Sequence, residues 1–294
     1  MALNEKAVLS TVLYADIFSF PLTSSEIWSN LLSDKQINRS GVDSAISTLL
    51  KRKILFRESE YISVRNDKNL FKSRIGSVEI LQNKYLVANK AASILAKIPS
   101  VYLIGISGSV AAGNARKEDD IDFFIVSRDN MLWTTRLLSA VSLLRHGLNR
   151  KRNDEKVADK ICLNMFVSLS NLKIPASQQD IYIAHEVSQL VPLYSRNGTY
   201  EKFIAENLWI KNFLANFRLK KPFVTGEEVE VDYGFMYRSP MVQLAKYSQK
   251  TYMKPHKTTE KISDDILAFH PYDYRKYALE EYEERIKRFK LKNI

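Results

Sequence analysis

Two aspartates, Asp120 and Asp122, stand one residue apart in an apolar stretch that follows a turn of small residues. Because alternate residues of a strand face the same side, a strand over Ile121 to Val126 would project both carboxylates together. Carboxylates so placed repel each other unless a cation lies between them, and Mg²⁺ takes carboxylate and phosphate oxygens together. The pair therefore predicts a site for a metal-bound nucleoside triphosphate.

The turn before the aspartates contains Gly108-Ser109 and follows a run from Val101 to Ile104 that predicts a buried strand. Glycine and serine let the backbone turn tightly and approach a ligand closely. The residues from Val110 to Ala115 predict a short helix, and the free N–H groups at a helix start favour an anion. We therefore expect Gly108 and Ser109 to contact the phosphates of the nucleotide.

In order, spacing and hydrophobic flanks, this block resembles the signature of the nucleotidyltransferase superfamily typified by DNA polymerase beta. That signature is Gly-Ser, a gap like residues 110–119 here, and Asp-x-Asp on a strand. The resemblance implies that Asp120 and Asp122 are catalytic and hold Mg²⁺ or Mn²⁺. It also implies transfer of a nucleotidyl group from a nucleoside triphosphate, with ATP expected, to a hydroxyl acceptor, with release of pyrophosphate.

The superfamily usually has a third carboxylate on a later strand of the same sheet, and here the sequence departs. The next strand candidate, Lys160 to Val167, has Asn164 where the acid is expected. An asparagine offers a carbonyl oxygen to a metal but cannot accept a proton as a general base. Either two aspartates suffice with Asn164 as a third ligand, or another acid such as Asp159 or Glu186 reaches the site, or the enzyme is slow or inactive. The alternative for Asn164 is a hydrogen-bonded core amide.

Three basic residues are further candidates for contacting the nucleotide. Arg116 and Lys117 lie just before the aspartates, and Arg136 lies on the helix expected over Met131 to Leu148. Basic residues also gather in 145–160, which we interpret either as a loop at the mouth of the site or as a solvated loop.

The N-terminal region predicts three helices and a hairpin. Their ranges are Ala7–Phe20, Ile27–Leu32, Ser40–Lys53 and Ile54–Val64. This order resembles a winged helix-turn-helix domain.

If that domain reads DNA, four basic residues at the third helix, Arg39, Lys51, Arg52 and Lys53, would contact backbone phosphates. The outward face of that helix offers aspartate, serine and threonine, a poor set for reading bases. Dimerisation or protein docking is therefore an equal alternative for this domain.

The predicted fold class is α+β, with an N-terminal winged helix-turn-helix, a central nucleotidyltransferase mixed sheet flanked by helices, and a helical C-terminal region. The predicted domain boundaries are 1–68, a connecting helix over 69–97, the catalytic domain over 98–195, and the helical region over 196–294. We expect the basic residues of the connecting helix, Lys84 among them, to be solvated.

The chain after the catalytic block predicts four more helices, Ile181–Leu193, Tyr200–Phe217, Met241–Met253 and Tyr272–Lys292. The first carries His185 and Glu186, but adjacent helical residues point about 100° apart and do not form a catalytic pair. We therefore expect both side chains to be structural.

The composition narrows the class of protein. The net charge of +11 arises from 44 basic and 33 acidic residues and favours polyanionic partners without naming one. The single cysteine, Cys162, excludes an internal disulfide and suits a reducing compartment. No N-terminal signal is visible, and the most apolar later segment, 131–148, contains two arginines, so we expect a cytoplasmic protein without a membrane span.

Over its length the chain also resembles a prokaryotic group of nucleotidyltransferases that places a winged helix before the catalytic domain and has no assigned substrate. The residues that carry this likeness, besides the Gly-Ser and Asp-x-Asp block, are Leu13–Phe18, Pro21–Thr23, Trp133, Arg136, Lys160–Asn164 and Pro192–Tyr194. The acceptor can be a small molecule, an RNA end or a protein hydroxyl. The alternative function is a non-catalytic, nucleotide-sensing regulator that binds DNA or a protein; Asn164 favours it and the intact Asp-x-Asp opposes it.

Overall fold

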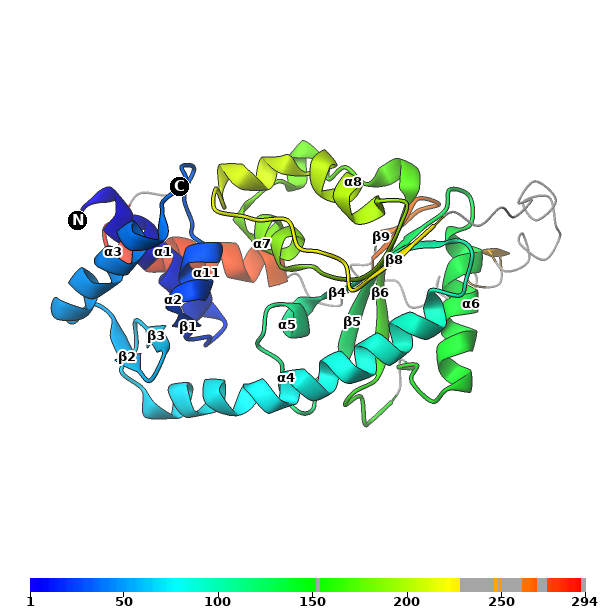
Figure 1. Cartoon of the computed structure of the whole chain (residues 1–294), viewed down its shortest axis with the longest axis horizontal. Helices are drawn as coiled ribbons and strands as arrows, with labels where there is room; N and C mark the ends of the chain where they lie inside the picture. The colour runs from blue at the N-terminus through cyan, green and yellow to red at the C-terminus, as the bar shows by residue number, and fades with distance from the viewer. Residues whose placement is uncertain (152–153, 228–245, 248, 250–260, 269–273, 292–294) are drawn as a thin grey trace.

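One long helix, α4 (Lys68–Leu95), runs along the molecule and connects a small N-terminal part to a larger part built on a sheet (Figure 1). At 1.5 Å per residue the helix is about 42 Å long. The computed structural model describes residues 1–151, 154–227, 246–247, 249, 261–268 and 274–291.

The N-terminal part contains the three predicted helices and the predicted hairpin. A three-stranded antiparallel sheet has the order β1-β3-β2. The second helix begins at Ser24, where Thr23 and Glu26 form a reciprocal capping box: the Glu26 amide donates to the Thr23 hydroxyl and the Thr23 amide to the Glu26 carboxylate. The elements are α1 (Leu3–Ile17), β1 (Leu22–Thr23), α2 (Ser24–Ser29), α3 (Arg39–Lys51), β2 (Phe56–Glu58) and β3 (Tyr61–Ser63).

The larger sheet is mixed, as predicted, and has the order β8-β7-β4-β5-β6-β10-β9. Its central strand β5 pairs antiparallel with β4 and parallel with β6. The strands are β4 (Val101–Ser107), β5 (Ile121–Ser127), β6 (Ile161–Ser168), β7 (Val191–Arg196), β8 (Val224–Gly226), β9 (Lys261–Ile262) and β10 (Ile266–Ala268).

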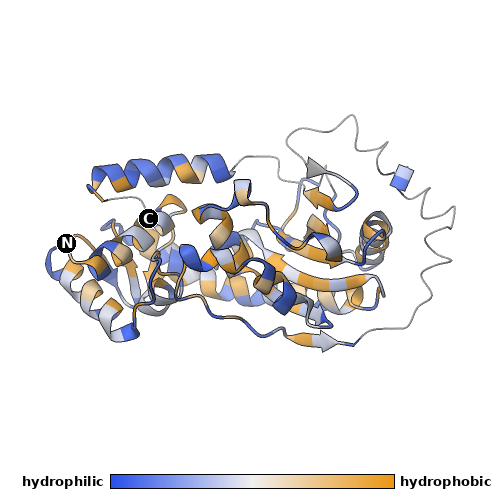
Figure 2. Cartoon of the chain, turned by 90° about the horizontal axis from the view of Figure 1, so that it is seen from above, coloured by the Kyte–Doolittle hydropathy of each residue, from blue (hydrophilic) through white to orange (hydrophobic). Residues whose placement is uncertain are grey.

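Helices cover both faces of this sheet, and the hydrophobic strands lie between them (Figure 2). On β5, Ile121, Phe123 and Ile125 belong to the core formed with α4 and α6 (Leu132–Arg145). Phe124 and Val126 belong to the opposite core, with α7 (Ile181–Gln189) and α8 (Thr199–Glu206). Each such buried side chain contributes about 1.5–3 kcal/mol. This alternation decides which face each residue of β5 presents.

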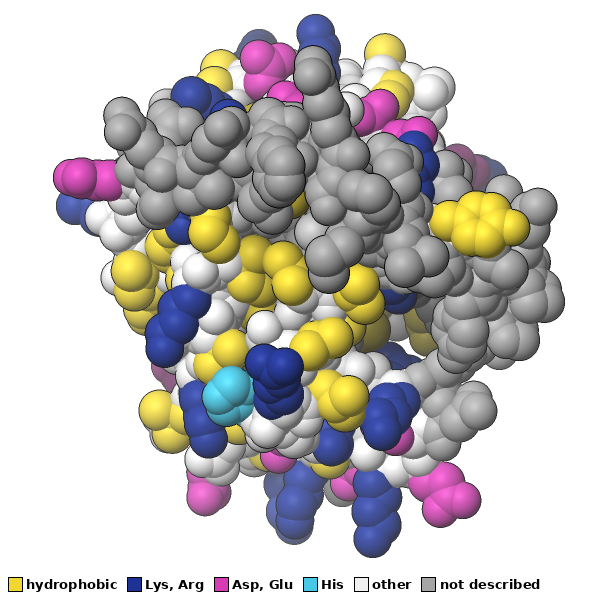
Figure 3. Space-filling view, turned by 90° about the vertical axis from the view of Figure 1, so that its right-hand side faces the viewer, with side chains coloured by type: hydrophobic (Ala, Val, Ile, Leu, Met, Phe, Trp, Pro, Cys, Tyr) yellow, Lys and Arg dark blue, Asp and Glu magenta, His cyan; other side chains and the backbone are white. Residues whose placement is uncertain are grey.

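The helix α6 lies at the end of the molecule that faces the viewer in Figure 3, where hydrophobic side chains and Lys and Arg side chains share the surface. Four of its apolar residues are partly exposed, namely Leu137, Leu138, Val141 and Leu144. None of the described helices combines the length and hydropathy needed to cross a lipid bilayer.

The region after residue 196 was predicted to be helical, and this is wrong in part because three short strands there, β8, β9 and β10, extend the sheet. The helix predicted over Tyr200–Phe217 ends at Glu206 and gives way to a 3₁₀ turn. Asn207 explains the break: its side chain donates to the Leu172 carbonyl at 2.8 Å and accepts from the Ile174 amide at 2.9 Å, which ties this point to another loop.

The last predicted helix is present as α11 (Tyr274–Arg288) and packs against α1 and α7, although it lies far from α1 in the sequence (Figure 1). An ion pair of 3.4 Å between Arg285 and Asp16 joins α11 to the end of α1. The helix predicted over Met241–Met253 falls largely outside the described residues.

We expected the basic residues of α4 to lie in solvent, but two of them, Arg74 and Lys84, are buried. Arg74 is buried between the rings of Phe20 and Tyr61 and forms an ion pair of 2.6 Å with Glu26, so it fastens α4 to the N-terminal part. Lys84 is also buried, with 1% of its surface exposed.

Candidate active site

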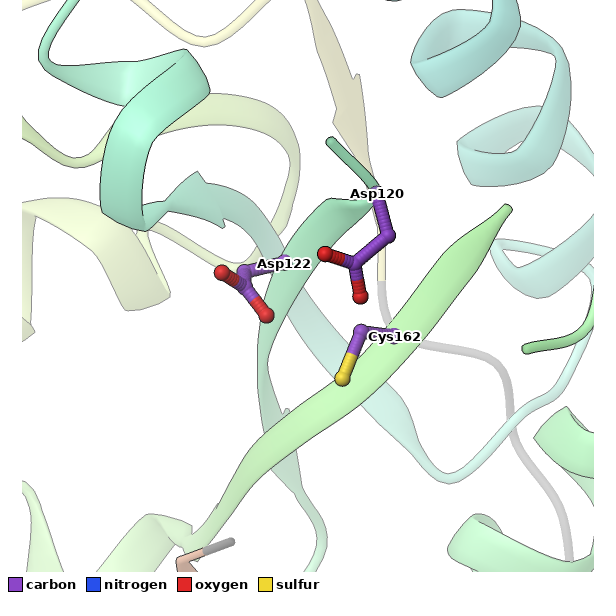
Figure 4. Close-up of side chains that lie close together, drawn as sticks. All are labelled: Asp120, Asp122 and Cys162. Atoms are coloured by element: carbon purple, nitrogen blue, oxygen red, sulfur yellow. The ribbon is translucent and has the colours of Figure 1, made fainter. Parts of the chain in front are cut away.

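The side chains of Asp120, Asp122 and Cys162 meet at the neighbouring ends of β5 and β6 (Figure 4). One ligand atom from each lies within 4.8 Å of the others. The parallel register aligns Asp122 with Cys162, so the thiol stands beside the second aspartate. The structure therefore brings together the two predicted aspartates and adds a cysteine.

The sequence pattern placed Asn164, rather than Cys162, at the third position of the cluster. In the structure, Cys162 is the residue in register with Asp122. Beyond this pair, β5 advances from Asp122 to Phe124 while β6 advances from Cys162 to Met165, so β6 has one extra residue there. Such a bulge breaks the simple alternation of faces. Asn164 is buried and lines the same cavity as the aspartates. Aligning the first residues of the two apolar runs would have placed Cys162 opposite Asp122.

Gly108 begins the one-turn helix α5 (Gly108–Ala111), two residues before the predicted start. Its φ is +66°, a conformation that favours glycine. A Cβ atom there would lie 2.6 Å from the Asp122 Oδ2 atom. Gly108 is therefore required both by the turn and by the carboxylate that occupies the space beside it.

The adjacent Ser109 is held by Asp119, a residue that the sequence reasoning missed. The Ser109 hydroxyl donates to Asp119 Oδ2 at 3.2 Å, and the Arg116 amide donates to the same oxygen at 2.9 Å. Asp119 thus ties the glycine turn to the loop that leads into β5. Its position directly before Asp120 was the available sequence signal.

Lys84 supports this loop from the other side. Its Nζ atom donates to the backbone oxygens of Asp119 and Lys117, at 2.6 and 3.4 Å, and to Asp159 Oδ1 at 3.0 Å. Asp159, which we considered as a substitute for the third carboxylate, is therefore the partner of a buried lysine. No sequence signal distinguished Lys84 from the exposed lysines of the same helix.

Arg150 supplies a positive charge inside the acidic cluster, because its guanidinium group forms an ion pair with the Asp120 carboxylate. Arg150 belongs to the basic segment 145–160, for which the sequence left a loop at the mouth of the site open. Among the described residues of the segment, Arg150 lines the cavity beside the aspartates.

Burial and, to a smaller extent, the nearby charge of Asp120 together raise the pKa of Asp122 to about 7. Burial and the same two carboxylates also raise the pKa of the Cys162 thiol, so the cysteine is neutral. Two carboxylates that destabilise each other fit a divalent cation, and Mg²⁺ prefers their oxygens to a thiol. The donor set thus fits Mg²⁺ or Mn²⁺ held by Asp120 and Asp122.

A cavity of about 1170 Å³ opens from this cluster. Its walls come from the glycine turn, the starts of β5 and β6, α7, and the N-terminal helix α1 with the loop after it. Arg116 lines it, as do His185 and Glu186 on α7. The N-terminal part therefore forms one wall of the candidate active site.

Arg136 and Lys117 were both predicted to contact the nucleotide, and neither lines the cavity. Asp120 lies at the start of β5, whereas Arg136 lies on α6, which follows the other end of that strand. The Arg136 guanidinium group donates a hydrogen bond of 2.7 Å to the Gln249 side chain. The structure does not bring Arg136 to the cavity, and the Lys117 residue contributes its carbonyl to Lys84.

The four basic residues predicted to bind nucleic acid are exposed at α3 and the turn after it. Arg39 pairs with Asp43 on the same helix at 3.3 Å, and Arg52 pairs with Glu5 of α1 at 2.9 Å. The other two predicted residues, Lys51 and Lys53, also have exposed side chains.

In the comparison with protein families, residues 88–163 match the family described as a nucleotidyltransferase domain. This span runs from the end of α4 through the glycine turn, both aspartates and Cys162. No curated protein and no solved structure matches the chain.

Proposed function

The chain carries a domain of the nucleotidyltransferase superfamily in residues 88–163, and from this premise we propose that it transfers a nucleoside monophosphate from a nucleoside triphosphate to a hydroxyl acceptor. The proposed reaction depends on Mg²⁺ or Mn²⁺, with ATP as the expected nucleotide, and releases pyrophosphate. The observation that carries the proposal is the packing of Gly108 against Asp122, which sets the glycine turn beside two clustered carboxylates.

Asp120 and Asp122 would hold the divalent cation. When bound, this cation neutralises charge on the triphosphate and on the departing pyrophosphate. The backbone at Gly108 and Ser109 would bind phosphate oxygens, and Arg116 supplies a further positive charge in the cavity. The acceptor oxygen attacks the α-phosphorus, and the bond from that phosphorus to the β-bridging oxygen breaks. The chain contributes mainly orientation and charge stabilisation.

The test uses each of the four α-labelled nucleoside triphosphates with Mg²⁺ or Mn²⁺ and a cell lysate as the source of acceptors. Asp120→Asn and Asp122→Asn should each lower label transfer by at least about 10²-fold, the cost of losing one electrostatic group in an active site. Asp34→Asn, which alters an exposed carboxylate outside the cavity, is the control. Normal transfer by both site variants would contradict the proposal.

We also propose that residues 1–68 form a winged helix, with 69–97 as a connecting helix, 98–195 as the catalytic domain and 196–294 as a C-terminal region. The element order α1-β1-α2-α3-β2-β3 and the sheet order β1-β3-β2 support the winged helix. Because α1 lines the cavity, this domain would contribute to the active site whether or not α3 binds nucleic acid.

The alternative is a nucleotide-sensing regulator without transfer activity. Asn164, where the superfamily usually has an acid, favours it, and so does the thiol that Cys162 places beside Asp122. In that case Arg39, Lys51, Arg52 and Lys53 would bind DNA or RNA phosphates. Metal-dependent nucleotide binding without label transfer, together with salt-sensitive nucleic-acid binding that is lost on substituting these four residues, would support the regulator.

A further inference from the structure

The proposed transfer needs a group that accepts the proton of the acceptor hydroxyl, and the metal cluster offers none. Asp120 and Asp122 would be engaged with the cation. The third member, Cys162, offers a thiol rather than a carboxylate. The base must therefore come from elsewhere in the cavity.

Five acidic residues line the cavity in the described part of the chain, namely Glu26, Asp119, Asp120, Asp122 and Glu186. Glu26 is engaged with Arg74, at 2.6 Å, and with the capping box of α2. Asp119 accepts hydrogen bonds from the Ser109 hydroxyl and the Arg116 amide. Both carboxylates are thus committed to local structure.

Glu186 differs from Glu26 and Asp119 because no Lys or Arg side chain and no backbone amide among the described residues bonds to its carboxylate. Its carboxylate has a hydrogen bond with Tyr182, one turn earlier on α7. His185, beside it, is stacked on Tyr14 with ring centroids 4.2 Å apart and is 5% exposed. The two residues therefore have different surroundings, and the Glu186 carboxylate has a hydrogen bond with a tyrosine but no ion pair among the described residues.

The sheet also places Glu186 on the correct face. Asp122 projects from β5 on the same face as Phe124 and Val126, and this is the face that α7 covers. Glu186 and Asp122 line one cavity, and the charge of Glu186 contributes to the raised pKa of Asp122. A substrate held by Asp122 would thus have α7 on its open side.

We infer that Glu186 is the base that accepts the proton of the acceptor hydroxyl, and that the acceptor binds between the metal cluster and α7. This inference rests on the proposed function and departs from the structural role expected for Glu186 from its sequence. The cavity of about 1170 Å³ exceeds the ~300–1000 Å³ typical of a site for one drug-sized ligand, so an acceptor fits beside the nucleotide.

In the step so assigned, the hydroxyl oxygen forms a bond to the α-phosphorus while its proton passes to a Glu186 carboxylate oxygen. The bond between the α-phosphorus and the β-bridging oxygen breaks, and pyrophosphate leaves with that electron pair. The protonated Glu186 then releases its proton to solvent. Burial raises the pKa of Glu186 to about 7, which suits a base that works near neutral pH.

The experiment compares Glu186→Gln with the wild type in two measurements. Titration with the Mg²⁺ complex of the preferred nucleotide gives its Kd, and single-turnover transfer of α-label in the presence of lysate gives the rate. We expect Glu186→Gln to lower the rate about 10²–10⁴-fold, the usual contribution of a general base, and to leave the Kd within about threefold of the wild type. Glu186→Asp, which keeps a carboxylate, should recover part of the rate.

Glu206→Gln is the matched control, because Glu206 is an exposed glutamate on the neighbouring helix α8 and does not line the cavity. Transfer by Glu186→Gln at the wild-type rate would overturn the inference and leave the proposed function standing. A loss of nucleotide binding equal to that of Asp122→Asn would also overturn it, since Glu186 would then serve the nucleotide rather than the acceptor. If the wild type itself transfers no label, the proposed function fails and the inference fails with it.

Discussion

The side-chain amine of Lys84 donates a hydrogen bond of 2.6 Å to the backbone carbonyl of Asp119, the residue directly before Asp120. The same amine donates to the Asp159 carboxylate, two residues before β6 begins at Ile161. The long helix α4 therefore fixes the chain at the points where both site-bearing strands begin. A buried charge of this kind is tolerated because three oxygens surround it.

Replacing Lys84 with methionine should disturb the site without removing any residue that lines it. The variant leaves the Asp119 carbonyl without its donor, so we expect a loss of about 1–3 kcal/mol in unfolding free energy and at least a tenfold loss of transfer. Urea denaturation and the label assay measure the two effects. Lys90→Met, at an exposed position of the same helix, should change neither. Unchanged stability and transfer in Lys84→Met would show that the loop needs no such support.

Gly108→Ala should abolish transfer. The added methyl group would meet Asp122 Oδ2 at 2.6 Å, at a residue whose φ of +66° already disfavours alanine. Gly76→Ala is a control on α4, where nothing lies within 4 Å of the new atom and alanine favours the helix by up to about 1 kcal/mol. Transfer assays and thermal melts of both variants decide the matter. An active Gly108→Ala enzyme would mean that Asp122 is free to take another position.

Arg150→Ala should strengthen binding of Mn²⁺ alone, because the guanidinium group competes with a cation for the Asp120 carboxylate. The pair is partly exposed, so the gain should not exceed about fivefold, the equivalent of roughly 1 kcal/mol. Calorimetric titration with Mn²⁺ in the absence of nucleotide measures it. Weaker Mn²⁺ binding by the variant would instead assign Arg150 a role in shaping the metal site.

His185 should make the stability of the fold depend on pH. Burial lowers its pKa to about 3 in the folded protein, below the usual 6.5 of an unfolded chain. The unfolded state therefore binds the extra proton first. The contribution of the neutral ring to the free energy of unfolding is therefore complete above about pH 6.5. It falls by about 1.36 kcal/mol per pH unit as the pH drops from there toward 3.

Phenylalanine at position 185 keeps a ring to stack on Tyr14 and removes two ring nitrogens that have no hydrogen-bond partner in the described structure. We expect His185→Phe to match or exceed the wild-type stability at pH 7.5 and to gain relative to it between pH 6 and 5. Urea denaturation at each pH gives the difference. Parallel stability curves for the two proteins would show that His185 is accessible to protons in the folded state.

The sequence by itself determined the features that depend on neighbouring residues. Strand alternation predicted that Asp120 and Asp122 face together, and the capping residues Thr23 and Glu26 marked the start of α2. Hydrophobic periodicity also predicted the strands that begin at Val101 and Ile121, whereas the mixed sheet was implied by the resemblance to the nucleotidyltransferase superfamily. These features depend on backbone geometry over a few residues, which local side-chain types control.

Only the tertiary structure decided the partners of these residues. The register between β5 and β6 placed Cys162, rather than Asn164, beside Asp122. Strands of two or three residues are too short to show a period, so β8, β9 and β10 were missed in a region predicted to be helical. The burial of Lys84 likewise depends on a contact with residues 33 and 35 positions away. Register and long-range contacts are set by how whole elements pack, and this information is distributed over the chain rather than contained in any one segment.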